Sequence, residues 1–242
     1  TGIIVHGGCG VVAACKYASS GMGLFGLATV WGVSVALAIF ATRDISGAHL
    51  NPAISCSLAA NAGFPVEELA PYVGAQVCGA TFAGAVNYAL MAAGIASVES
   101  VQKIVRGTST ATFAGAFGMA PTAALLSPAG AVLAEVWATS VLAFLVFALT
   151  DPQGTVPRDA APVLIGSVVA VLITIFGPLT GCGMNPARDL GPRFVSFAAG
   201  WGSVAWSHWW IYTLGPVVGA VLGGAFYTFA FKPLQPGRDS DA

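Results

Sequence analysis

Long apolar stretches alternate with short polar ones along the whole chain. Six apolar stretches carry few or no charged residues, and they lie near residues 1–17, 22–42, 66–94, 128–150, 161–178 and 206–231. An apolar run of about 18 residues or more is long enough to cross the hydrocarbon core of a bilayer as an α-helix. The pattern therefore predicts six membrane-spanning helices. The first is short, and we expect it to begin before Thr1.

Two further segments, 51–61 and 185–195, are moderately apolar but too short to span a bilayer. Both begin with the same tripeptide, 134 residues apart: Asn51-Pro52-Ala53 and Asn185-Pro186-Ala187. In each half of the chain the tripeptide follows the second span and precedes the third. An odd number of spans per half turns the second half upside down relative to the first, so the pattern predicts an inverted repeat.

This pattern also predicts the domain organisation. We expect a single transmembrane channel domain over 1–242, divided into a first repeat at 1–94, a connecting loop at 95–127, a second repeat at 128–232 and a polar tail at 233–242.

The paired tripeptides predict two short helices that begin inside the membrane. Asn is a favoured N-cap, and Pro suits the first helical position. Gly47 and Gly181 permit non-helical backbone before each tripeptide, and such backbone survives at membrane depth only if it is buried or lines a wet cavity. Each helix N-terminus carries about half a positive charge. Where the two N-termini meet, they would repel cations and protons, while Asn51 and Asn185 donate hydrogen bonds to a passing oxygen.

Composition agrees with a membrane chain and excludes several other functions. Hydrophobic residues make up 56% of the chain and charged residues only 8%, whereas a soluble domain carries about a quarter charged residues. A net charge of -1 provides no basic surface for nucleic acid. The sequence has no CxxC pair, metal-ligand cluster, nucleophile–base set or phosphate-binding glycine loop, so we predict no enzyme activity, no cofactor and no metal site.

These residues resemble the aquaporin and glycerol-facilitator superfamily over essentially the whole chain. The stretch from Asn185 to Arg193 is similar to the aquaglyceroporin branch, in which an aspartate such as Asp189 directly after the arginine is typical. The resemblance implies an all-α membrane protein with six tilted transmembrane helices and two re-entrant half-helices, assembled as a homotetramer with one pore per subunit. It further implies an integral protein of the plasma membrane or the bacterial inner membrane with cytoplasmic termini.

The resemblance also implies a selectivity filter built from four residues: Trp31, Ile173, Cys182 and Arg188. A charge as deep in an apolar region as Arg188 is expensive, and its forked donors can hold two hydroxyls while its charge repels cations. The face of Trp31 would pack against the carbon backbone of a polyol. Glycerol facilitators usually carry Gly and Phe in place of Ile173 and Cys182, and water-selective channels usually carry His in place of Ile173.

Further residues are expected to support the pathway. The resemblance implies a ladder of backbone carbonyls from Gly47, Ala48, His49, Gly181, Cys182 and Gly183. It implies that Glu135, inside the fourth span, accepts hydrogen bonds from the backbone of a re-entrant loop. Asp189 is expected to support the structure as well, but not by pairing with Arg188, because adjacent side chains on a helix point apart.

The leading hypothesis is passive diffusion of glycerol and similar small neutral solutes, together with water, with ions and protons excluded. The alternative is a water-selective or a nodulin-26-type, metalloid-permeable aquaporin. An ion-coupled transporter would need a buried proton or sodium site, for which the spans offer only Glu135 and the Arg188-Asp189 pair. A structural tetramer with a closed pore is also compatible with the sequence.

Overall fold

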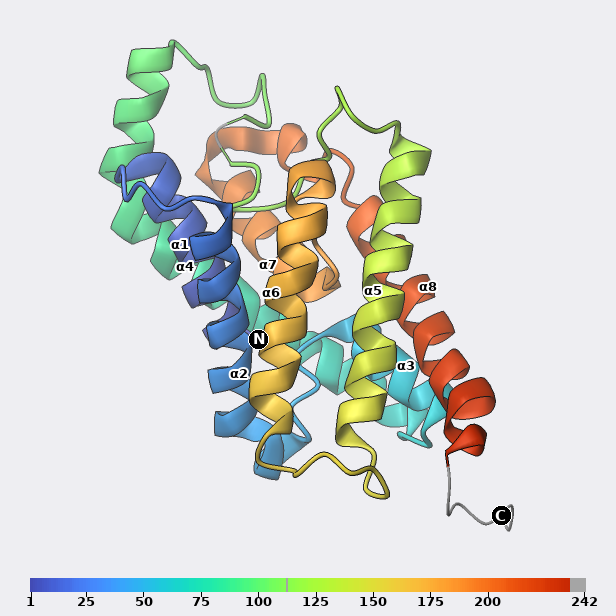
Figure 1. Cartoon of the computed structure of the whole chain (residues 1–242). Coiled ribbons are helices and arrows are strands. Elements are labelled where there is room, and N and C mark those ends of the chain that lie inside the picture. The colour runs from blue at the N-terminus through green and yellow to red at the C-terminus, as the bar shows by residue number, and fades with distance from the viewer. Residues whose placement is uncertain (112, 236–242) are drawn as a thin grey trace.

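The chain folds into a bundle of long helices around two short ones (Figure 1). The computed structural model describes residues 1–111 and 113–235, and within them it contains helices and no strand. The helices are α1 (Gly2–Tyr17), α2 (Leu24–Ser46), α3 (Pro52–Asn61), α4 (Leu69–Gln102), α5 (Pro128–Thr150), α6 (Ala161–Thr180), α7 (Pro186–Ser196) and α8 (Ile211–Ala225). Short helical turns complete them: η1 (Val66–Glu68), η2 (Phe197–Trp201), η3 (Gly202–Trp206), η4 (Phe226–Phe231) and η5 (Lys232–Leu234).

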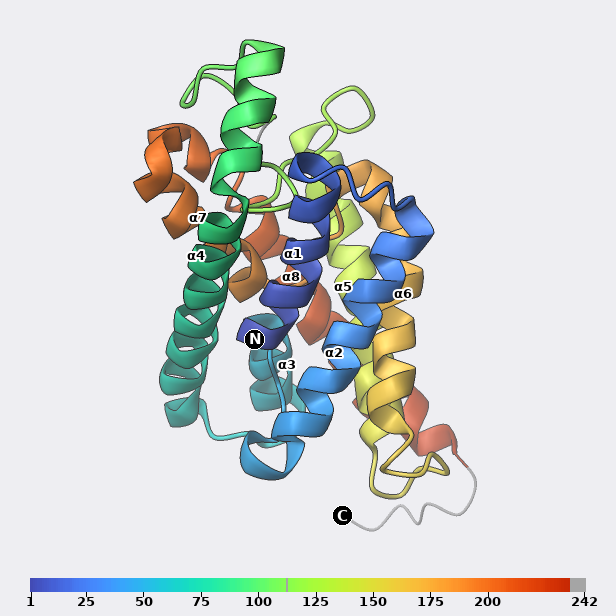
Figure 2. The same cartoon turned by 90° about the vertical axis from the view of Figure 1, so that its left-hand side faces the viewer.

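Five helical segments of the described chain are long and apolar enough to cross a membrane. They contain α2, α4, α5, α6 and α8, and α1 is a shorter apolar helix of 16 residues. The two short helices α3 and α7 lie among the long ones, α3 in the lower half of the bundle and α7 in the upper half (Figures 1 and 2). The predicted fold class is confirmed.

The crossing of α2 and α6 displays the repeat in three dimensions. Gly32 on α2 and Gly166 on α6 are 134 residues apart, as the two tripeptides are. A Cβ added at Gly32 would lie 2.4 Å from the carbonyl oxygen of Gly166, and a Cβ at Gly166 would lie 2.4 Å from that of Gly32. Only glycine permits backbones to approach this closely. The reciprocal contact therefore relates the two halves about a shared axis.

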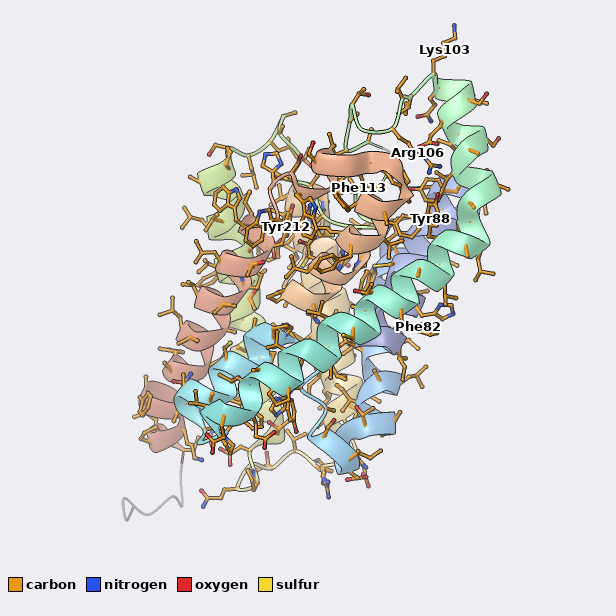
Figure 3. The ribbon with its side chains drawn as sticks, turned by 180° about the vertical axis from the view of Figure 1, so that it is seen from behind. Phe82, Tyr88, Lys103, Arg106, Phe113 and Tyr212 are labelled. Atoms are coloured by element: carbon orange, nitrogen blue, oxygen red, sulfur yellow. The ribbon has the colours of Figure 1, made fainter. Side chains whose placement is uncertain are left out.

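Helix α4 is longer than the hydrophobic pattern indicates. It ends at Gln102 rather than near residue 94, so the connection that was expected to begin at residue 95 is still helical there. Polar residues such as Ser97 and Glu99 end the apolar run, but a helix satisfies its own backbone in water as well as in lipid. A helix of 34 residues is about 50 Å long, against about 30 Å for a bilayer core. Its end at Lys103 consequently projects beyond the bundle (Figure 3).

The predicted polar tail at 233–242 is described only in part. The chain continues through η5 to residue 235, and residues 236–242 lie outside the described residues.

Candidate permeation pathway

A narrow cavity of about 90 Å³ lies at the centre of the bundle. Apolar side chains of α2, α5 and α6 line one side of it: Val35, Ile39, Leu142, Val146, Ile165 and Val169. The two re-entrant loops line it with polar backbone and with Asn51 and Asn185. Ile39 and Ile165 also line a wider cavity of about 520 Å³ between the end of α2 and the α5–α6 connection. One end of the narrow cavity thus adjoins the wider cavity, and we call it the wide end. The other end lies at Arg188, and we call it the filter end.

The two re-entrant loops have the same backbone conformation at positions 134 residues apart. Left-handed φ angles occur at Gly47 (70°), Ala48 (52°) and Leu50 (56°), and again at Gly181 (79°), Cys182 (58°) and Met184 (49°). A positive φ is uncommon for residues other than glycine and marks a backbone that its surroundings hold in place. The matching conformations indicate that both loops serve one purpose.

The residues that line the narrow cavity lie slightly later in each loop than the sequence indicates. Ala48, His49, Cys182 and Gly183 line it, as do Leu50 and Met184, which the sequence analysis did not single out. Gly47 lines the wider cavity instead. Gly181 is not among the lining residues of either cavity, and its left-handed backbone turns the chain out of α6.

Asn51 and Asn185 tie the two halves together at their meeting point. The Oδ1 of Asn51 accepts from the backbone N–H of Ala53 at 2.9 Å, and the Oδ1 of Asn185 accepts from those of Ala187 and Arg188, both at 3.1 Å. Each Nδ2 donates across the junction: Asn51 to the carbonyl of Met184 at 2.7 Å, and Asn185 to that of Leu50 at 2.9 Å. An amide nitrogen carries two hydrogens, so each side chain still has a donor for a molecule in the cavity.

Glu135 is fully buried on α5 and holds the second re-entrant loop. Its Oε1 accepts from the N–H of Gly183 at 2.9 Å and from the hydroxyl of Thr180 at 2.6 Å. Its Oε2 accepts from the N–H of Met184 at 2.8 Å. The carboxylate thus satisfies backbone donors that lie outside any helix, as buried backbone groups require.

All four predicted filter residues line the narrow cavity: Trp31, Ile173, Cys182 and Arg188. The guanidinium carbon of Arg188 lies 4.5 Å from the ring centroid of Trp31, which is cation–π distance. Arg188 Nη2 donates to the carbonyl of Gly115 at 3.4 Å. Its Nη1 is buried and has no hydrogen-bond partner in the described part of the chain. A cationic donor is therefore open to a molecule in the cavity.

Asp189 pairs with Arg193, one helical turn later, and not with Arg188. Both side chains are fully buried, and Arg193 Nε lies 2.7 Å from Asp189 Oδ2. Arg193 also donates to the carbonyls of Met119, Ala205 and Ser207, while Asp189 Oδ1 accepts from the N–H of Met119 at 2.7 Å. The sequence analysis missed Arg193 as the centre of this network. The acid-to-base spacing of four residues on one short helix was the signal for it.

At the wide end, His49 lies among aromatic rings. Its ring centroid is 4.7 Å from that of Phe64 and 4.9 Å from that of Tyr72. Its Nδ1 lies 3.1 Å from the hydroxyl of Ser55, which also accepts from Gln76 Nε2 at 3.1 Å. The groups around His49 are thus aromatic or hydroxyl and amide groups, while the charged residues of this end, Arg43, Asp151 and Arg158, line the wider cavity beyond it.

A sequence profile of the major intrinsic proteins matches residues 1–227. The chain belongs to this family. As a major intrinsic protein it is an integral membrane channel and not an enzyme. It is 42% identical over 235 residues to the glycerol uptake facilitator protein of Haemophilus influenzae, an alignment that covers 94% of this chain and 89% of the relative.

Two further comparisons agree with this membership. This major intrinsic protein is 40% identical over 237 residues to a propanediol uptake facilitator of Citrobacter freundii, covering 95% of this chain and 88% of the relative. It also matches the X-ray structure of the aquaglyceroporin from Plasmodium falciparum with a TM-score of 0.81 and 27% identity, covering 96% of this chain and 94% of that one.

Proposed function

We propose that this major intrinsic protein is a passive channel for glycerol and similar small neutral solutes, together with water, and that it excludes ions and protons. The two-sided lining of the narrow cavity is the observation that carries the proposal. Val35, Val169 and their apolar neighbours form one side, and the asparagines and loop backbone form the other. Glycerol presents hydroxyls along one edge and carbon along the other, so both of its edges meet a matching surface.

Arg188 and Trp31 support a polyol as the permeant. Both line the filter end, and the unpartnered Nη1 of Arg188 offers a charge-assisted hydrogen bond to a hydroxyl. The indole ring beside it supplies an apolar face for the carbon backbone. A polyol can use both surfaces at once.

Exclusion of ions follows from the charges along the path. The N-termini of α3 and α7 meet at Asn51 and Asn185, and each contributes about half a positive charge. Arg188 adds a full charge at the filter end. A cation or hydrated proton therefore meets positive potential twice.

The relatives' names favour small polyols over other neutral solutes. The relative with 42% identity is called a glycerol uptake facilitator, and another with 40% identity a propanediol uptake facilitator. Ile173 and Cys182 decide the ranking, because Ile173 occupies space at the filter and Cys182 leaves space free. If Ile173 closes the slot, the alternative function is that of a water-selective or metalloid-permeable aquaporin.

We further propose that the protein is a homotetramer in the plasma membrane or the bacterial inner membrane, with both termini cytoplasmic. In this orientation the wide end faces the cytoplasm, and the 103–127 connection and the filter end face outward. The family resemblance supports this assembly, and the mass of the detergent-solubilised protein by light scattering tests it.

Stopped-flow light scattering on proteoliposomes tests the permeant. Vesicles are exposed to gradients of glycerol, propanediol and the impermeant sucrose, so that solute and water permeabilities are both measured. Trp31→Ala should lower glycerol permeability about tenfold, because it removes the apolar face and the cation–π partner of Arg188. Trp137→Ala is the matched control, since 65% of Trp137 is exposed on the outer face of α5.

Arg188→Val tests the exclusion of ions. Removing the fixed charge at the filter should admit small cations, which a pH-sensitive dye or a potential-sensitive dye inside the vesicles detects. Fast water flow through the wild-type protein with glycerol flux no greater than in empty vesicles would instead place the chain with the water-selective or metalloid-permeable channels.

A further inference from the structure

The connection between α4 and α5, residues 103–127, reaches the filter through its backbone. The carbonyl of Gly115 accepts from Arg188 Nη2 at 3.4 Å. In the part of the chain that the structure describes, no other residue accepts a hydrogen bond from the Arg188 side chain. This one carbonyl therefore orients the filter arginine together with the ring of Trp31, against which the guanidinium lies.

The backbone conformation at Gly115 is held in place by neighbouring residues. Its φ of +85° is in the left-handed region, and its N–H donates to the carbonyl of Gly118 at 2.7 Å. A Cβ at Gly115 would lie 3.4 Å from Val12 on α1. The carbonyl that orients Arg188 thus sits in a tight turn pressed against the end of α1.

Lys16, in the last turn of α1, holds the peptide just before this turn. Its Nζ donates to the carbonyl of Ala114 at 2.8 Å and to that of Ala111 at 2.9 Å. Ala114 and Gly115 are consecutive, so two cationic side chains hold neighbouring carbonyls: Lys16 holds the first and Arg188 the second. Hydrogen bonds from charged donors are about twice as strong as neutral ones.

The connection is also anchored on either side of this turn. At the start, Arg106 Nε lies 2.9 Å from both carboxylate oxygens of Glu99 and Arg106 Nη1 donates to the hydroxyl of Tyr88 at 2.8 Å; Figure 3 shows the Arg106 side chain beneath the connection beside α4. Further on, Ser196 donates to the carbonyl of Phe117 at 2.7 Å. A change at Lys16 would therefore act locally on the peptides at Ala111, Ala114 and Gly115 and leave these other anchors in place.

We propose that Lys16 is a positioning residue for the selectivity of this channel. By holding the carbonyl of Ala114 it fixes the neighbouring carbonyl of Gly115, and through that carbonyl it fixes the guanidinium of Arg188 over Trp31. The inference rests on the proposed function. Glycerol must engage several groups at once, whereas water needs one donor at a time, so a loosened Arg188 impairs glycerol more than water.

The test compares Lys16→Met, Lys16→Arg and the matched control Lys103→Met in proteoliposomes. Lys103 is exposed at the projecting tip of α4, and its side chain points away from the bundle (Figure 3), so its replacement removes a charge from the same end of the molecule without releasing the connection. For Lys16→Met we expect the ratio of glycerol to water permeability to fall about threefold or more, the size of one weakened hydrogen bond. Lys16→Arg should restore most of the ratio, and Lys103→Met should leave it unchanged.

Each other outcome contradicts the inference in a recognisable way. A Lys16→Met ratio equal to that of the wild-type protein would show that Arg188 does not depend on Lys16. A proportional fall in both permeabilities would indicate a purely structural role, and an equal effect of Lys103→Met would indicate charge alone. A wild-type protein that passes water but no glycerol would contradict the proposed function itself, and this inference with it.

Discussion

The two re-entrant segments share a backbone and differ in side chains. Both have left-handed residues at equivalent positions, and both begin with a carbonyl that accepts from a tyrosine hydroxyl: Ser46 from Tyr72 at 3.1 Å, and Thr180 from Tyr212 at 2.8 Å. Each asparagine caps its own helix and donates to the other loop. The pathway is therefore a property of the repeated backbone.

The side chains on α3 and α7 divide the tasks. Where α7 has Arg188, Asp189 and Arg193, the positions 134 residues earlier on α3 have Ile54, Ser55 and Ala59. Ser55 belongs to the uncharged group around His49 at the wide end. The three charged residues belong to the filter end, where one faces the cavity and two form a buried ion pair. One backbone scaffold thus carries three charged residues on α7 and uncharged residues at the matching positions of α3.

Replacing Arg193 should cause the largest loss of stability, because it breaks the buried Asp189–Arg193 ion pair, which the first half lacks. Arg193→Met leaves the carboxylate of Asp189 buried without its cation, at a cost of about 3–5 kcal/mol in unfolding free energy. Thermal unfolding of the detergent-solubilised protein measures it. As a control, Arg158→Met removes an arginine that is 76% exposed and pairs with Asp44, and should cost less than about 0.5 kcal/mol.

A double variant removes both members of the buried ion pair. Asp189→Ser combined with Arg193→Ala gives α7 the residues that α3 has at these positions. It should be more stable than Arg193→Met alone, because no buried charge is stranded. Stability of Arg193→Met equal to that of the wild-type protein would mean that the ion pair is dispensable in the second half as well.

Glu135→Gln should have an intermediate effect. The amide nitrogen of glutamine cannot accept a hydrogen bond, so the N–H of either Gly183 or Met184 loses its acceptor, at a cost of about 1–3 kcal/mol. Because the whole loop is loosened, glycerol and water permeabilities should fall together. Glu68→Gln, at an exposed position next to α4, is the control. An unchanged unfolding temperature for Glu135→Gln would show that the loop holds its shape without the carboxylate.

The smallest expected effect is the difference in unfolding free energy between Asn51→Ala and Asn185→Ala. Each change to alanine removes an N-cap worth about 1 kcal/mol and one hydrogen bond between the halves. Asn185 caps two N–H groups and Asn51 one, so Asn185→Ala should cost more by about 0.5–1 kcal/mol. Side-by-side unfolding measurements decide it, and a greater loss for Asn51→Ala would contradict the geometry.

The fold was largely predictable because its determinants are local or repeated. The apolar runs gave the spans, and the spacing of the tripeptides gave the repeat, which reappears where Gly32 meets Gly166. The predicted end of α4 was wrong, because the apolar pattern indicates where the lipid-facing part of a helix ends and not where the helix itself ends. Its end is instead set by Lys103, which adopts a left-handed conformation.

The sequence predicted those site residues that lie in the two Asn-Pro-Ala motifs or at a fixed distance from them. The four filter residues were implied by the family resemblance and matched to this sequence by their distance from the asparagines. All of them line the cavity, and their part in selectivity stays a prediction. Gly115 and Lys16 gave no such signal. Their roles depend on a carbonyl that a long connection brings back to α7, and sequence spacing does not encode such a contact.

The reciprocal contacts between the halves also bear on how molecules cross. A carrier completes one delivery per cycle because one half rocks against the other. Here such rocking would break the bonds of Asn51 to Met184 and of Asn185 to Leu50, and would separate the backbones of α2 and α6. We therefore expect the pathway to keep one shape while molecules follow one another through it. Flux is then set by the gradient and not by a cycle time, and it rises with concentration where a carrier would level off.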